Sequence, residues 1–145
     1  MDLTQQKADL LIAMAKYKVN DEISRFPLPG RSVSVKLTSF DRKQEFLLDV
    51  FRGRIALNKI TYQTRAQAII PLVRVDIGGA PHRNPDGMEI SVPHIHLYRE
   101  GYGDKWAFPL PADKFPSPGD QYKTLYDFYR YCNIIEPPLL ENVLF

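Results

Sequence analysis

The chain has 145 residues, of which 44% are hydrophobic and 25% charged, a balance typical of a soluble globular protein with one domain. Nineteen Lys and Arg against 17 Asp and Glu give a net charge of only +2, which by itself does not indicate nucleic-acid binding. The lone cysteine, Cys132, excludes an intramolecular disulfide, and no stretch approaches the ~18 apolar residues of a membrane span. We therefore expect a single domain over residues 1–145, in the cytoplasm and without membrane contact.

The first predicted element is a helix over residues 3–18, where apolar side chains recur at helical spacing. Asp2 or Thr4 is its candidate N-cap. The segment FPLPG at 26–30 contains two prolines and a glycine, and it predicts a connector between this helix and the next element.

A series of strands comes next, because apolar and polar residues alternate between turn-forming segments. NPDG at 84–87 has the residues of a type I turn, and Pro93 breaks or bulges the strand around it. Every link is too short for a parallel crossover, so we expect about six antiparallel strands. They span residues 32–38, 45–51, 54–62, 69–77, 88–101 and 105–110.

A second helix is predicted near the C-terminus. Ser117 is its expected N-cap, with Pro118 in the first turn and Asp120 at the acidic position of a capping box. The tail 139–145 is expected to pack back on the body. The order of helix, strands and helix predicts an α+β fold with N-terminal and C-terminal helices, its antiparallel sheet either open or curled and barrel-like.

The segment PHIHLYREGYGDKW at 93–106 concentrates the chemically active side chains. On a strand, alternate residues share a face. His94, His96, Tyr98 and Glu100 therefore fall on one face, and the opposite face, which carries Ile95 and Leu97, is expected to meet the core.

The leading hypothesis is a phosphodiester-acting protein, in particular a toxin-type endoribonuclease that binds RNA and has an antitoxin as protein partner. All three histidines lie within residues 82–96, and histidine suits both acid and base roles near neutral pH. Cations and aromatic rings nearby would hold phosphate and bases. The candidate catalytic residues are His82, His94, His96 and Glu100, and the candidate phosphate- or ligand-binding residues are Arg83, Arg99, Lys105 and Tyr98.

Two further hypotheses use the same residues. In the first, a non-enzymatic binding or regulatory protein presents this polar face to a partner, and the charged neighbours Arg74 and Asp76 form an ordinary surface pair. In the second, His94, His96 and Glu100 bind a divalent metal, although no cofactor is required by the leading hypothesis. Their spacing resembles the first metal-binding motif of the cupin barrels, HxHxxxE, over about fifteen residues.

Three longer segments carry a second resemblance. FLLDVFRGRIALNKITYQTR, HRNPDG and HIHLYREGYGDKWA together resemble a small uncharacterised family of bacterial proteins. The resemblance covers most of the chain. It implies no activity, no cofactor and no functional residue, because that family has none assigned.

Overall fold

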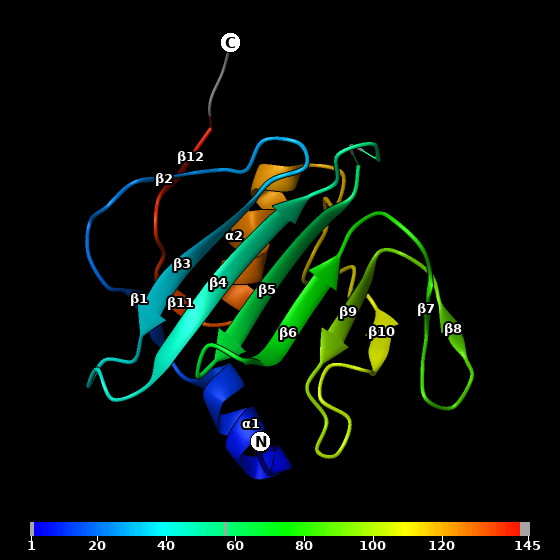
Figure 1. Ribbon diagram of the computed structural model, residues 1–145, viewed down its shortest axis with the longest axis horizontal. Helices are drawn as coiled ribbons and strands as arrows, with labels where there is room; N and C mark the ends of the chain where they lie inside the picture. The colour runs from blue at the N-terminus through cyan, green and yellow to red at the C-terminus, as the bar shows by residue number, and fades with distance from the viewer. Residues whose placement is uncertain (1, 57, 143–145) are drawn as a thin grey trace.

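A large, mostly antiparallel sheet dominates the computed structural model, which describes residues 2–56 and 58–142 (Figure 1). Within those residues this sheet has eight strands. Its two edges are different strands, so the sheet is open and the barrel-like alternative is wrong. The order across the sheet is β10 (Ala107–Pro109), β9 (His94–Leu97), β6 (Ile70–Asp76), β5 (Ile60–Ala66), β4 (Glu45–Arg52), β3 (Ser32–Thr38), β1 (Lys16–Lys18) and β11 (Ile134–Glu136).

Two helices and two small strand pairs complete the described fold. Figure 1 shows the helix α2 (Gln121–Tyr131) packed against one face of the sheet, while α1 (Gln5–Ala13) lies near one end of its strands. The α+β class is thus confirmed. No helix in the described residues is long and apolar enough to cross a membrane. The small pairs are β2 (Ser24–Arg25) with β12 (Leu140–Glu141), and the hairpin of β7 (His82–Arg83) with β8 (Glu89–Ile90).

The sheet face toward α2 forms the core. Alternating residues of the central strands point to this face, which removes their apolar side chains from water and drives folding. Tyr62 also donates a hydrogen bond from its hydroxyl to the Gln121 carbonyl at 2.7 Å, which ties β5 to the start of α2. The side chains packed here include Leu48, Val50, Tyr62, Val75 and Ile95 of the sheet with Leu125 and Phe128 of α2.

The first helix ends at Ala13, five residues earlier than predicted. Lys16 is fully buried, and its ammonium donates to the carbonyls of Ile12, Met14 and Cys132 at 2.8–2.9 Å. Residues 16–18 form β1, which pairs in parallel with β11. The prediction that all strands are antiparallel was therefore wrong at this edge of the sheet. The partner of β1 is β11, which lies more than 100 residues later in the chain and can therefore run parallel to it.

Two boundaries also differ from prediction, while the tail agrees with it. The second helix starts at Gln121, since Asp120 is its N-cap and accepts hydrogen bonds from two main-chain amides. The strand predicted over 54–62 begins only at Ile60, and residue 57 lies outside the described residues. In the tail, Leu140–Glu141 pairs with β2, as expected for a segment packed on the body, while residues 143–145 lie outside the described part.

Candidate metal centre on the open face of the sheet

The sheet face opposite α2 carries two neighbouring rows of side chains across the strands, all of them polar except Phe51. The first row aligns Asp49, Gln63, Arg74 and His96 from β4 to β9. The second aligns Phe51, Thr61, Asp76 and His94 on the same strands. Because side chains directly opposite one another in a sheet lie in contact, strand register alone brings Arg74, Asp76, His94 and His96 together.

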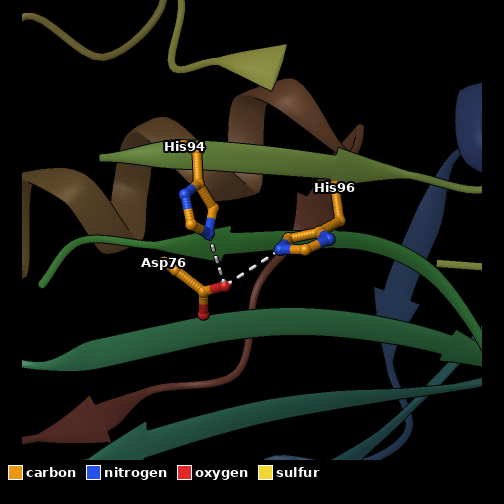
Figure 2. A group of neighbouring side chains, drawn as sticks. All are labelled: Asp76, His94 and His96. Atoms are coloured by element: carbon orange, nitrogen blue, oxygen red, sulfur yellow. Dashed lines mark hydrogen bonds and ion pairs between the residues drawn. The ribbon is translucent and has the colours of Figure 1, made fainter. Parts of the chain in front are cut away.

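Asp76 is the centre of this group (Figure 2). Its Oδ1 accepts a hydrogen bond from the Thr61 hydroxyl at 2.7 Å. Its Oδ2 lies 3.1 Å from the Nε2 atoms of both His94 and His96 and 3.3 Å from Nε of Arg74. Burial alone would raise the pKa of Asp76, but the contact with His96, the charge of Arg74 and the Thr61 hydroxyl together hold that pKa well below its usual value. Asp76 is therefore a carboxylate at neutral pH.

Both imidazoles use their other nitrogen on the main chain. His94 Nδ1 lies 3.2 Å from the Ile90 carbonyl and 3.3 Å from that of Ser91. His96 Nδ1 lies 2.8 Å from the Asp104 carbonyl. A carbonyl only accepts, so both Nδ1 atoms carry a proton and donate it. The side chains are almost fully buried, at 2% and 1% exposed, which fixes the rings in this orientation.

The Nε2 atoms consequently bear lone pairs when the rings are neutral. For His96 the neighbouring guanidinium favours this form, because Arg74 Nη2 lies 3.0 Å from Nε2 and can only donate, whereas a proton on Nε2 would instead be donated to Asp76. Lone pairs of two nitrogens then face one carboxylate oxygen. That contact is favourable only with a proton or a cation between the atoms.

The three ligand atoms of Asp76, His94 and His96 lie within 4.8 Å of one another. Two ligands bound at about 2.0 Å to one tetrahedral ion are about 3.3 Å apart, close to the 3.1 Å between Oδ2 and each Nε2. Two imidazoles and one carboxylate form a donor set for zinc, iron, cobalt or manganese, with coordination positions left for water or substrate.

Arg74 is held beside this group by two carboxylates. Its Nη1 donates to Asp104 Oδ2 at 3.1 Å, and its Nε faces Asp76. The residues Arg74 and Asp76 are therefore more than the exposed surface pair that the sequence suggested. Asp76 has only 16% of its side chain exposed.

His82 lies over the two buried histidines. Its ring centre is 4.6 Å from that of His96 and 6.1 Å from that of His94. Its Nε2 donates to the Lys105 carbonyl at 2.7 Å, and the side-chain amide of Asn84 is paired with the main chain of Ala107. These bonds dock the β7–β8 hairpin on β10. The three histidines are thus brought together, although His82 stands outside the Asp76 group.

The other predicted site residues lie elsewhere. Glu100 does not join the histidines, because β9 ends at Leu97 and the Glu100 carboxylate accepts from the Gln5 amide of α1 at 2.7 Å. Tyr98 is buried in the core, where its hydroxyl binds the main chain of Leu3. The predicted face that joined these two residues to His94 and His96 was therefore wrong. Glu100, the third predicted metal ligand of the HxHxxxE motif, is therefore not placed to bind a metal with His94 and His96.

The predicted cations are also dispersed. Arg83 pairs with Glu89 within the exposed hairpin. The guanidinium of Arg99 lies over the Trp106 ring, 4.6 Å from its centre. Lys105 is exposed and meets the cluster through its carbonyl, which His82 binds. The cation beside the histidines is Arg74, which was not a predicted site residue.

Sequence reasoning missed Asp76 and Arg74 as site residues. VRVD at 73–76 alternates strictly, with Val73 and Val75 in the core, so the pattern does place the two charges on one face. The pattern did not show that β9 would be the neighbouring strand. Asp76, Arg74 and Thr61 also line an open hollow of about 340 Å³, together with Phe51, Lys59, Gly78 and Ala80.

Residues 3–134 match a family described as a family of unknown function, DUF6978. The match covers most of the chain. The chain belongs to this family. The resemblance to an uncharacterised family is thus confirmed, while a bacterial origin stays a prediction. No curated protein and no solved structure matches the chain.

Proposed function

We propose that this protein binds a divalent transition-metal ion between Asp76 Oδ2, His94 Nε2 and His96 Nε2. One observation carries the proposal. Both imidazoles donate Nδ1–H to main-chain carbonyls and aim Nε2 at the same carboxylate oxygen. Histidine ligands of metals characteristically donate their second nitrogen to a carbonyl or carboxylate, which fixes the tautomer that binds the ion.

The ion would replace Arg74 as the partner of His96 Nε2. Arg74 would keep its ion pair with Asp104, because that pair uses Nη1 while the histidine contact uses Nη2. The Thr61 hydroxyl would continue to orient the Asp76 carboxylate through Oδ1, leaving Oδ2 for the metal.

The test is a titration of chelator-treated protein with Co²⁺, followed by visible absorption, and with Zn²⁺, followed by calorimetry. We expect one ion per chain. Asp76→Asn, His94→Gln and His96→Gln should each weaken binding by about a hundredfold or more, since each removes a ligand or its charge. Circular dichroism of each variant checks that it is folded.

Asp49→Asn is the matched control, because Asp49 is a partly buried carboxylate on the same sheet face with no histidine contact among its bonds. It should bind metal like the unchanged protein. Equal affinity in the unchanged, Asp49→Asn and Asp76→Asn proteins would refute the centre.

The phosphodiester-acting hypothesis stays a prediction, with changed roles for its residues. His94 and His96 are too buried to exchange protons directly with a bound RNA, at 2% and 1% exposed. A metal ion held by them would serve phosphate chemistry instead, by polarising the phosphoryl oxygen or activating a water. Cleavage of RNA by the metal-loaded protein, lost in Asp76→Asn, tests this role. The toxin and antitoxin assignments and the non-enzymatic partner-binding alternative remain predictions as well.

A further inference from the structure

The hollow beside Asp76 has features that the metal centre alone does not use. It is an open depression of about 340 Å³ on the polar face of the sheet. Two cations, Lys59 and Arg74, line it together with the hydroxyl-bearing Thr61 and the ring of Phe51. Phe51 is 37% exposed, so part of its ring is accessible to a ligand in the hollow.

The glycines after β6 place Lys59 at this hollow. A Cβ on Gly78 would lie 2.6 Å from the Asn58 carbonyl oxygen, so only glycine lets the two segments approach so closely. Gly79 has φ +104°, a conformation that favours glycine, and the Lys59 side chain lies across it, with Cδ 3.4 Å from the position of a Cβ. The close approach thus sets the Lys59 side chain in the same hollow as Asp76.

The balance of charges in the hollow favours an anionic ligand. A divalent ion at the centre, with Lys59 and Arg74, outweighs the carboxylates of Asp76 and Asp104. The ion would also release the Arg74 Nη2 donor from His96, and the guanidinium would stay in place through Asp104. A fixed guanidinium beside a lysine and a metal is an arrangement suited to phosphate oxygens.

We propose that this hollow binds the phosphate group of a nucleotide next to the metal ion, with the base stacked on Phe51. The inference rests on the proposed metal centre and names the ligand class of that centre. Lys59 and Arg74 contact the phosphate oxygens. Base stacking on an aromatic ring is tolerant of sequence, so a mononucleotide and a single-stranded RNA share the same chemistry here.

Phosphorus NMR of Co²⁺-loaded protein tests the proposal, because paramagnetic Co²⁺ broadens the signal of a phosphate bound near it. The probes are inorganic phosphate, adenosine monophosphate and a short single-stranded oligoribonucleotide. Lys59→Gln should weaken all three by about tenfold, in line with the loss of one charged hydrogen bond. Lys36→Gln is the matched control, an exposed lysine on β3 outside the hollow, and should change none of them.

Phe51→Leu separates the base from the phosphate. It keeps an apolar side chain but removes the ring, so it should weaken the adenosine ligand and the oligoribonucleotide severalfold and leave inorganic phosphate unchanged. Tighter binding of the oligoribonucleotide than of the mononucleotide would identify a strand as the ligand, and the reverse would identify a free nucleotide; either supports the site.

The Co²⁺ titration without phosphate tests the centre separately. If Co²⁺ binds but no probe is broadened beyond the level seen with Asp76→Asn, the phosphate site is refuted and the metal centre stands. Equal losses in Lys59→Gln and Lys36→Gln would show attraction by general charge and would likewise refute the site. Absence of Co²⁺ binding would refute the centre and this inference with it.

Discussion

Asp49 and Asp76 are the same residue type on the same face of the same sheet, yet their surroundings differ in one respect. Asp49 accepts from the guanidinium of Arg65 at 2.6 and 2.8 Å, from the Ser34 hydroxyl and from the Gln63 amide. All of these partners are donors. Asp76 has a hydroxyl and a guanidinium too, but it also faces the Nε2 atoms of two imidazoles whose Nδ1 atoms donate to main-chain carbonyls.

We interpret this difference as that between a structural carboxylate, Asp49, and a proposed metal ligand, Asp76. Donors around Asp49 satisfy its lone pairs completely within the chain, which makes a buried charge tolerable. Around Asp76 two neutral imidazoles would add lone pairs, and we propose that a cation binds between them and the carboxylate. β5 lies between them and serves both, since Gln63 binds Asp49 and Thr61 binds Asp76. Comparison of variants at the two carboxylates therefore tests the interpretation directly.

The largest expected effect is the stabilisation of the protein by metal. An ion that binds only the folded state at a hundred times its Kd adds about 2.7 kcal/mol to the free energy of unfolding. Zn²⁺ should do this for the unchanged protein and for Asp49→Asn, and should do nothing for Asp76→Asn. Urea unfolding with and without the ion measures it. An equal gain in all three proteins would remove the distinction between the carboxylates.

The second largest expected effect is the loss of folding stability on substitution of Asp49. Asp49→Asn should lower the free energy of unfolding by about 2 kcal/mol without metal, because it breaks a bidentate ion pair at a site that is only 17% exposed. Asp113→Asn, at an exposed position, is the control and should cost under about 0.5 kcal/mol. Urea unfolding at neutral pH gives both values. Equal values would mean that the Asp49 bonds contribute nothing.

The pH dependence of that loss should follow the pKa of Asp49. Burial raises the pKa of Asp49. Hydrogen bonds from Arg65, Ser34 and Gln63 lower it by more than burial raises it, so the net shift is downward. Between the folded pKa and the unfolded value of about 3.9, the unfolded chain binds more protons. The stability from Asp49 is therefore complete above about pH 4 and falls as pH drops through the folded pKa.

We thus expect the stability difference between the unchanged protein and Asp49→Asn to be constant from about pH 7 to 5 and to shrink below about pH 4. Urea unfolding across this range, without metal, measures it. A difference that stayed constant down to about pH 2 would contradict the assigned cause.

The smallest expected effect comes from Thr61. Thr61→Val removes the hydroxyl that orients Asp76 and should weaken metal binding by about tenfold, or about 1.4 kcal/mol. Ser34→Ala removes the matching hydroxyl at Asp49, 2.6 Å from its Oδ1, and should leave metal affinity unchanged. Co²⁺ titration distinguishes them. Equal affinities in the two variants would mean that Thr61 does not support the centre.

Local pattern predicted the parts of the fold that depend on local chemistry. The alternation in SVSVKLT predicted β3 with the bounds that the structure has, Ser32–Thr38. The Asn84–Gly87 turn is closed by a hydrogen bond from the Gly87 amide to the Asn84 carbonyl at 2.8 Å, as its residues predicted. Each of these features is decided by neighbours within a few positions of the chain.

Contacts between distant segments decided what the pattern could not predict. The predicted helix included residues 16–18 because Tyr17 continues its apolar stripe. These residues form β1 instead, because β3 and β11 lie on either side and the Cys132 carbonyl accepts a hydrogen bond from Lys16. Glu100 was placed with the histidines by alternation, and the early end of β9 turned it to α1. In both cases the energy of a long-range contact outweighed the local preference.

The sequence by itself determined the class of fold, the presence of a histidine cluster and, to within one residue at each end, the strands β3, β4 and β6, because side-chain periodicity and turn residues act locally. Only the tertiary structure decided which acid joins His94 and His96. Asp76 lies 18 residues before His94 in the sequence, and the antiparallel register of β6 with β9 sets them opposite each other. Register depends on the packing of both faces of the whole sheet, so no local pattern could have chosen Asp76 over Glu100.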